Sequence, residues 1–559
     1  MKPDAGHDQP LPESADQCFE ECGRLRDELR DRGVAIPKHV RDALWAEQWN
    51  EFAESKPVDI DKLRKVEGDL RALLPREAGD QGSAEGDNTR GNGDLLQVIR
   101  PQISELFHDR DFKTFASIRV HGVKQVHAIE SESFRRWLAQ STYRARNKGA
   151  ANTMLEGLLQ TLAAEAQFDG LEHEVFNRVG RLDDDLFIDL GNDEWSAVKV
   201  EPGSWSVVSD APVKFWRPAS AKALPMPLRG GKIDLLWKYV NVAEADRPLV
   251  LAWILATFVP GGPYPLLALQ GEQGTAKSSA ARFLKRLTDP SKAPLRSIPS
   301  NELELANAAR HSRVLVFDNL SRLSDDMCDA LCRLSTGGGI TRRKLYTDTD
   351  EVVLEIQCPV IMTSITDLIT RPDLADRTYH VHLRYIEPED RRSERELAEA
   401  FERDAPLIVG ALFDALALAL VHVDTVSVTS LPRLADAARI AVAAEPALGL
   451  AAGSMEQALS QNSLNLDLGQ LVDVPFYGVL EAMSQEKDWD LTPSDLSFQL
   501  SQRATQKELD QPGWPRSLKS LGATLDRIAP VLRRRNIEVS RYRTAGSNSQ
   551  RMIRIRRTD

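Results

Sequence analysis

The segment that most constrains the fold is an apolar run, residues 265–270, followed at once by the glycine-containing loop Gly271–Ser278. Two glycines and the small Ala276 let the backbone curl so that its N–H groups point inward, where phosphate oxygens can bind. A helix predicted to start near Lys277 adds the positive end of its dipole. The pattern is that of a P-loop, with Ala276 as a mild departure where a second glycine is usual. It predicts a nucleotide site in a parallel α/β domain.

The residue types in this loop assign the expected ligands. Lys277 would reach the β- and γ-phosphates and Ser278 would ligate Mg²⁺, so ATP and Mg²⁺ are the expected cofactors. The expected nucleotide contacts are Gly271, Gly274, Thr275, Ala276, Lys277, Ser278 and Ser279.

A second compact apolar strand, residues 313–317, ends in Asp318 and Asn319. It looks like a Walker B strand, with Asp318 holding the metal ion or its water. Many ATPases carry glutamate at the next position as the base that activates water, and here that position is Asn319. Either the base lies elsewhere, or Asn319 only orients the water, or hydrolysis is slow.

A third apolar strand, residues 358–362, ends in Thr363 and Ser364. A polar side chain at this point would sit between the first two strands and touch the γ-phosphate or the attacking water. Thr363 is the preferred candidate, and a plain turn is the alternative.

Two arginines follow in the segment 371–377. An arginine in this place can act as a finger on the γ-phosphate of a neighbouring subunit, which would imply a ring. Arg377 is the preferred finger and Arg371 the second choice. The alternative is a structural ion pair with Asp373 or Asp376.

Taken together, these motifs resemble those of a known family, the ATPases of superfamily 3 helicases in their phage and plasmid primase-helicase branch. The resemblance runs from about Ile233 to Leu383, with a weaker one over residues 131–216. The matching segments of the ATPase part are GEQGTAKSS (271–279), VLVFDNLS (314–321), ALCRLSTGGGITRRKLYTDTDE (330–351), PVIMTSI (359–365) and RPDLADR (371–377). Those before it are FRRWLA (134–139), LFIDLG (186–191) and GSWSVV (203–208).

The resemblance implies an AAA+-like core in a hexameric ring that translocates on single-stranded DNA held in its channel. It also implies a hairpin between the second and third core strands that points into the channel. Glycines 337–339 would allow a tight tip in this hairpin. The positively charged side chains that follow them could contact DNA phosphates, and the tyrosine ring after those could stack on a base. The expected contacts are Arg342, Arg343, Lys344 and Tyr346; the alternative is a solvated loop that pairs with Asp348, Asp350 and Glu351. Family members commonly carry asparagine where this chain has Thr363, and no primase half is evident.

The C-terminal segment 515–559 is strongly basic, with twelve Arg or Lys and three Asp or Glu. Leucine and isoleucine recur at helical spacing from Leu518 to Leu532, and two alternating strands follow. A basic helix and β-hairpin predict a winged helix that binds DNA. A basic surface for the acidic remainder of the chain is the alternative. The candidate DNA contacts are Arg516, Lys519, Arg533, Arg534, Arg535, Arg541, Arg543 and Arg551.

Composition sets the remaining bounds. The 559 residues carry a formal net charge of −12, which argues against a uniformly basic nucleic-acid coat. Five cysteines and no apolar leader favour a reducing, cytoplasmic setting, and no segment is predicted to span a membrane. The expected multidomain α/β organisation is a helical module (1–74), a flexible linker (75–94), an α/β domain (95–231), the P-loop ATPase core (232–425), a helical lid or linker (426–473) and the basic winged-helix-like domain (474–559).

The leading hypothesis is therefore an ATP-driven DNA-translocating motor, a ring-forming replicative helicase of a mobile element that assembles as a homo-oligomer. The second is a non-motor DNA-binding ATPase that acts as an origin-binding or regulatory switch or as a phage-defence component. The third is a structural DNA-binding protein with a degenerate site.

Overall fold

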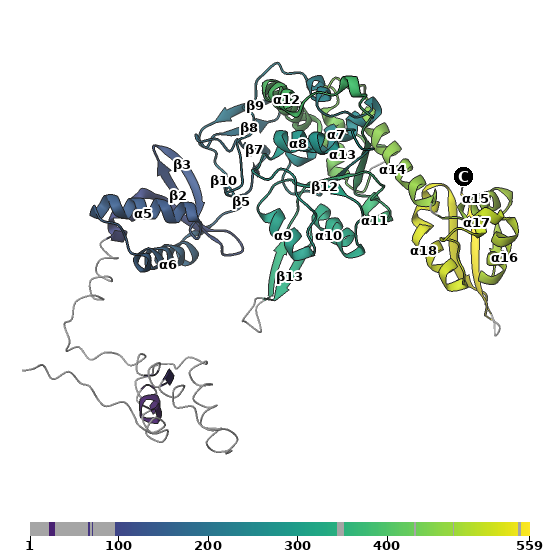
Figure 1. The fold of residues 1–559 in the computed structure, drawn as a ribbon, viewed down its shortest axis with the longest axis horizontal. Helices are drawn as coiled ribbons and strands as arrows, with labels where there is room; N and C mark the ends of the chain where they lie inside the picture. Colours follow the sequence, from purple (N-terminus) through teal and green to yellow (C-terminus); the bar gives the residue numbers. More distant parts are fainter. Residues whose placement is uncertain are drawn as a thin grey trace, which may run out of the picture. The chain divides into compact units, whose positions relative to one another are not determined.

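The computed structural model divides the chain into two compact units, Met1–Gly91 and Asn92–Asp559. The predicted linker 75–94 and most of the predicted helical module 1–74 lie outside the described residues. The second unit contains all of the labelled helices and strands used below (Figure 1). The structure describes residues 22–27, 29, 65–66, 70, 95–343, 351–429, 432–472, 474–545 and 549–558, with their side chains except in 340–355 and at Val472.

The second unit begins with a four-stranded mixed sheet of order β3-β2-β1-β4, which packs against helices α5 and α6. Ser131 starts α5 by accepting a hydrogen bond from the Phe134 amide, and Asn147 ends it in the left-handed conformation. The elements are η1 (Arg100–Gln102), β1 (Ile103–His108), β2 (Thr114–Val120), β3 (Val123–Ala128), α5 (Glu132–Arg146), α6 (Asn152–Phe168) and β4 (Leu171–Glu172).

A second small sheet follows, in which four strands pair antiparallel in chain order, β6-β7-β8-β9. Beside it, two short strands, β5 and β10, pair in parallel. All of these strands lie within the predicted α/β domain, residues 95–231. Their bounds are β5 (Val175–Phe176), β6 (Val179–Leu182), β7 (Asp185–Asp189), β8 (Ala197–Glu201), β9 (Ser204–Val208) and β10 (Lys214–Phe215).

The centre of the second unit is a parallel four-stranded sheet of order β12-β15-β11-β16. The predicted third strand, β15, does lie between the first two, β11 and β12. Near-continuous burial of these strands is typical of a parallel sheet covered on both faces. The strands are β11 (Leu266–Gln270), β12 (Leu315–Leu320), β15 (Val360–Ser364) and β16 (Thr378–His382).

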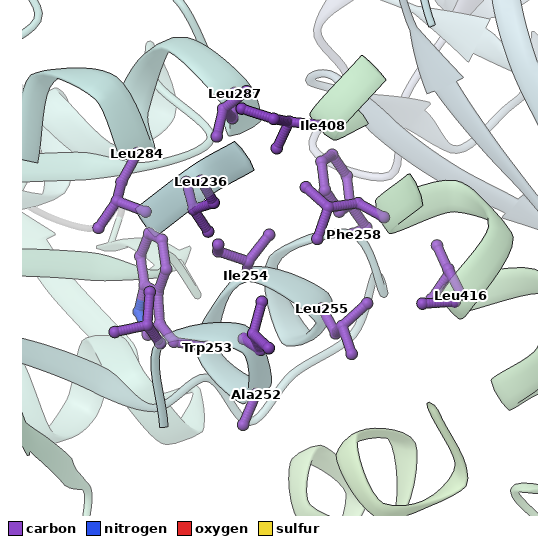
Figure 2. Close-up of a cluster of buried hydrophobic side chains, with 14 of the residues drawn as sticks. Leu236, Ala252, Trp253, Ile254, Leu255, Phe258, Leu284, Leu287, Ile408 and Leu416 are labelled. Carbon is purple, nitrogen blue, oxygen red and sulfur yellow. The ribbon is translucent and has the colours of Figure 1, made fainter. Parts of the chain in front are cut away.

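Each face of this sheet has its own apolar core. One face packs against α7 and α8, with α12 and α13 completing the cluster; Figure 2 shows Ile254 of α7, Leu284 of α8 and Ile408 of α12 within it. The other face packs against α9, α10 and α11. The elements are η2 (Ile233–Lys238), η3 (Glu244–Asp246), α7 (Arg247–Thr257), α8 (Lys277–Thr288), α9 (Glu302–Arg310), α10 (Asp325–Thr336) and α11 (Pro372–Ala375).

A buried charge cluster fixes the far end of α8. Asp289 Oδ2 accepts from Lys285 Nζ at 2.5 Å and from the Val314 amide at 3.1 Å. Its Oδ1 accepts from Arg178 Nε at 3.2 Å. Burial alone would raise the pKa of Asp289, but Lys285 and Arg178 outweigh it and hold the pKa well below its usual range. The cluster joins Arg178, which directly precedes β6, to the end of α8 and the start of β12.

An antiparallel hairpin, β13 (Gly339–Arg343) and β14 (Glu351–Glu355), lies between β12 and β15 in the chain, as predicted. The expectation that glycines 337–339 form its tip is wrong, because Gly339 pairs with Glu355 at the base of the hairpin. The side chains of Arg342 and Arg343, and the whole of Lys344 and Tyr346, lie outside the described residues. Their predicted contacts with DNA stay predictions.

Helix α12 contains the longest apolar run of the chain. It is long and apolar enough to cross a bilayer by length and composition, and most of that apolar window is buried inside the protein. Such burial is typical of a core helix, as the sequence predicts. Helices α13 and α14 follow it and contact α7. The bounds are η4 (Pro388–Asp390), α12 (Glu394–His422), α13 (Ala435–Ala444) and α14 (Ser454–Val472).

The C-terminal region has its own core and an antiparallel sheet of order β17-β19-β18. The predicted helix and hairpin are present as α18, β18 and β19, although Leu518, expected on the apolar stripe, is 46% exposed. The elements are α15 (Tyr477–Glu486), β17 (Trp489–Leu491), α16 (Pro493–Arg503), α17 (Gln506–Leu509), α18 (Leu518–Arg534), β18 (Ile537–Arg543) and β19 (Arg551–Arg557).

Candidate active site

The glycine-containing loop joins the end of β11 to the start of α8. A Cβ at Gly271 would lie 2.6 Å from Thr275 Oγ1, so only glycine allows this close approach. Gly274 has φ 87° and Ala276 has φ 60°, both in the left-handed region. For alanine this conformation costs about 1–2 kcal/mol, so the departure at Ala276 is more than a mild one. Ala276 is the N-cap of α8 and provides no side-chain cap, which leaves the first helical N–H groups available to an anion.

Lys277 lies at the mouth of this loop. Its Nζ donates to Gly271 O at 2.8 Å and to Glu272 O at 2.6 Å, so the ammonium group is held against the loop backbone. Burial lowers the pKa of Lys277, and the charge of Asp318 opposes that shift. Thr275 is buried and its hydroxyl donates to Glu272 O, which braces the curl from inside. Ser279, also predicted to contact nucleotide, lies in the first turn of α8.

Asp318 brings three elements together. Its Oδ1 accepts from Ser278 Oγ of α8 at 2.8 Å and from Thr363 Oγ1 of β15 at 2.6 Å. A hydroxyl and a carboxylate oxygen in contact suit a Mg²⁺ ion that completes its octahedron with phosphate and water. In the described part of the chain, no group of three or more His, Cys, Asp or Glu side chains could hold a metal ion.

Asn319 follows Asp318 at the same edge of the sheet. Strand β12 runs on to Leu320 instead of ending before Asp318, and its register is irregular between Phe317 and Leu320. Asn319 has φ 58°, a conformation that asparagine tolerates better than most residues, and its amide donates to Thr363 Oγ1 at 2.8 Å. Its side chain is exposed. The backbone N–H of Asn319 is therefore held by Thr363, while its side-chain carboxamide is open to solvent.

The two candidate finger arginines have protein partners in this chain. Arg377 is buried, and its Nη1 donates to Asp373 O at 2.5 Å. Arg371 is partly exposed, and its Nη2 lies 2.6 Å from both an Asp373 oxygen and Asp329 Oδ1. The predicted alternative, an ion pair of Arg371 with Asp373, is present.

Three of the eight candidate DNA contacts of the C-terminal region have acidic partners. Arg534 pairs with Asp467 of α14 and with Asp376, Arg541 pairs with Asp526, and Arg535 lies 3.7 Å from Glu481. These tertiary partners could not be predicted from local sequence. Seven of the eight, all except Arg535, are exposed, and four of these line a hollow between α18 and the hairpin: Lys519, Arg541, Arg543 and Arg551.

Sequence reasoning missed two residues near the loop. Tyr385 lines a hollow beside Gly271, and Arg391 donates from Nη2 to Tyr385 Oη at 3.1 Å. A Cβ at Gly274 would lie 3.3 Å from Arg391 Nη2, so the guanidinium group covers the loop. The one available signal is that both residues follow β16, which pairs directly with β11.

Comparison with family models matches two parts of the chain. Residues 233–467 match the model described as the actinomycete integrative conjugative element replication protein. Residues 477–559 match the model described as the AICE RepA C-terminal domain. The second match covers the region that holds the C-terminal sheet and helix α18.

Solved structures resemble the chain only distantly. Two structures of the NrS-1 C terminal region are 11% and 12% identical, with TM-scores of 0.37 and 0.38; they cover 83% and 82% of this chain and 98% of their own. A JCV helicase structure is 13% identical with a TM-score of 0.20, covering 43% of this chain and 65% of its own. No protein of curated function matches the sequence.

Proposed function

We propose that this chain, whose residues 233–467 and 477–559 belong to the replication-protein family of actinomycete integrative conjugative elements, is an ATP-driven motor on single-stranded DNA. The observation that supports the ATPase part most directly is the contact of Asp318 with both Ser278 and Thr363. The Asp318 carboxylate meets the hydroxyls of Ser278 and Thr363, and the three residues come from β12, α8 and β15. They lie beside the glycine-containing loop, where Lys277 donates to backbone carbonyls of the loop. This is the arrangement expected of a P-loop core.

The chain's own residues would divide the work of hydrolysis. The loop amides and Lys277 would bind the β- and γ-phosphates, and Ser278 and Asp318 would hold Mg²⁺, which neutralises charge on the transferring phosphoryl group. Thr363 fixes the orientation of Asp318 by donating to it. Asn319 follows Asp318 and is exposed, and we propose that it would orient the attacking water. An amide cannot remove a proton, so we expect slow turnover without DNA.

A ring would complete the site. We propose that the chain assembles as a homo-oligomer, a hexamer, in which an arginine of one subunit reaches the phosphates of the next. Arg377 would have to leave its buried position to do so, whereas Arg371 is already partly exposed. Single-stranded DNA would pass through the channel and contact the β13–β14 hairpin.

The C-terminal region would supply a second DNA contact. We propose that this region is a winged helix, which its order of α15, β17, α16, α17, α18, β18 and β19 and its three-stranded antiparallel sheet support. The exposed cations beside the hairpin suit phosphate oxygens. This would anchor the motor on the element's DNA.

A non-motor ATPase switch is the second candidate, and one observation favours it. The residue after Asp318 is Asn319 and not a carboxylate, which suits slow hydrolysis that times assembly on DNA. The two candidates share the nucleotide site and differ in whether DNA strands are separated.

The deciding experiment measures ATP hydrolysis by the full chain with Mg²⁺, with and without single-stranded DNA, together with strand displacement and particle mass. For a motor we expect stimulation by DNA, displacement of a duplex strand and a ring-sized particle, all lost when Mg²⁺ is chelated. Hydrolysis without displacement or a ring would establish the switch instead. No hydrolysis under any condition would remove both candidates.

Two adjacent arginines of α18 give a sharper test of the C-terminal contact. Arg533→Ala should weaken DNA binding and reduce the slope of log affinity against log salt by about 0.9, the value for one lost phosphate contact. Arg534→Ala should change that slope much less, because Asp467 and Asp376 already hold its side chain. Fluorescence anisotropy over a salt series measures both. Equal slopes for the two variants would contradict this assignment.

A further inference from the structure

We infer that the hollow beside the loop is a nucleobase subsite, in which the Tyr385 ring receives the base of the bound nucleotide and the neighbouring Arg391 guanidinium group holds that ring. The inference rests on the proposed function, because it presumes that the loop binds the phosphates. It concerns the base, which the phosphate-binding residues cannot recognise.

The strand order places this hollow on the correct side of the loop. Asp318 and Thr363 lie near the ends of β12 and β15, which are on one side of β11, and Tyr385 follows β16 on the other side. A nucleotide whose terminal phosphate points toward Asp318 therefore extends its sugar and base toward β16. The chain that leaves β16 is held there, because the Leu383 amide donates to Gln270 O at 2.8 Å.

The hollow has the size and lining that a base requires. Its volume is about 320 Å³, near the lower end of the 300–1,000 Å³ typical of small-molecule sites. Two large apolar side chains at its rim, Ile365 and Tyr385, are 52% and 50% exposed. Exposed rings beside a cleft are suited to stacking, and a tyrosine stacks on any base.

Arg391 connects the hollow to the phosphate loop. Its guanidinium carbon lies 5.8 Å from the centre of the Tyr385 ring, and its Nη2 bonds Tyr385 Oη while covering Gly274. The cation thus lies between the ring and the loop, where it can contact both the base and the phosphates. This contact holds the ring in one orientation before a ligand arrives.

Gln270, the last residue of β11, also lines the hollow. Its Oε1 is buried without a hydrogen-bond partner among the described residues, and such an acceptor costs about 1–3 kcal/mol. Because this atom has no access to solvent in the empty hollow, the Gln270 side chain would have to turn before a nucleoside hydroxyl or amino group could donate to it.

The test compares two ligands that share phosphates and differ in the base. Calorimetry with Mg²⁺ would measure the affinity of the full chain for ATP and for inorganic tripolyphosphate. We expect Tyr385→Ala to weaken ATP binding about tenfold, equal to about 1.4 kcal/mol, and to change tripolyphosphate binding less than twofold. Tyr385→Phe, which keeps the ring, should retain most of the ATP affinity.

The outcomes separate this inference from the proposed function. If the unaltered chain binds both ligands but Tyr385→Ala leaves ATP affinity unchanged, or weakens both ligands equally, the nucleobase subsite is wrong while the phosphate site stands. If the unaltered chain binds neither ligand, the proposed function fails and the subsite fails with it. Preferential loss of ATP affinity in Tyr385→Ala, with retention in Tyr385→Phe, would establish the subsite.

Discussion

Replacing Lys277 with alanine should lower kcat for ATP hydrolysis about 10²- to 10³-fold, the usual effect of removing one preorganised group that stabilises transition-state charge. Its ammonium group already faces the inside of the loop, 2.8 Å from Gly271 O. Phosphate oxygens would take the place of those carbonyls as acceptors. Because Lys277 is only partly buried, its loss should leave the folded core intact, and circular dichroism would verify this.

Lys292 provides the matched control for this prediction. It is an exposed lysine of the same region whose Nζ also donates to a backbone carbonyl, Ala219 O at 2.7 Å, away from the loop. Lys292→Ala should hydrolyse ATP within twofold of the unaltered chain. Hydrolysis by Lys277→Ala at the rate of Lys292→Ala would exclude a phosphate role for Lys277 and, with it, the proposed ATPase.

Removing the carboxylate of Asp289 should destabilise the central sheet by about 3–5 kcal/mol, because Asp289→Ala leaves the buried cations Lys285 and Arg178 without their counter-ion. Ser312 and Val314 also lose an acceptor. Thermal or urea unfolding of the full chain would register the loss. Ser312→Ala keeps the carboxylate but removes a hydroxyl that donates to Asp289 and accepts from Lys285, so it should cost less, about 2 kcal/mol.

An ion pair at the surface, between Arg286 of α8 and Glu402 of α12, provides the control for Asp289→Ala. Glu402 binds Arg286 through two oxygens at the surface, so Glu402→Ala should cost less than about 1 kcal/mol. Similar losses for Glu402→Ala and Asp289→Ala would show that the buried cluster contributes little.

The same cluster predicts a pH dependence. Because the pKa of Asp289 is lower in the folded chain than in the unfolded one, its contribution to stability is fully present above about pH 4, the unfolded value. It is lost as the pH falls through the folded value. The difference in stability between the unaltered chain and Asp289→Ala should therefore shrink in acid.

Local sequence predicted the elements around the loop because each signal there is short in range. The apolar strands β11, β12 and β15 and the loop between β11 and α8 can each be recognised from a few consecutive residues, whereas the β13–β14 hairpin was expected only from the family resemblance. The place of β15 between β11 and β12 was also expected, but the place of β16 beside β11 was not. The sequence predicted only that Asp318 and Thr363 lie near each other. It did not predict their hydrogen bond, because that bond depends on side-chain rotamers, which the spacing of residues in the sequence does not determine.

What the sequence did not predict depends on tertiary contacts or backbone angles. Arg534 and Arg541 read as free cations, and their acidic partners lie far away in the chain or on another element. The strain at Ala276 is visible only in its φ angle. Tyr385 and Arg391 belong to no motif, and they come to the loop because β16 pairs with β11.

The ion pair of Arg534 with Asp376 links α18 to the segment that carries both candidate finger arginines. Asp376 immediately precedes Arg377, so Arg534 of α18 contacts the residue next to a candidate finger. A movement of α18 that broke this pair would remove one contact that holds the segment 371–377 in place. By thermodynamic reciprocity, a ligand that shifted this segment would in turn alter the position of α18. Added salt would weaken this coupling, because it screens the pair.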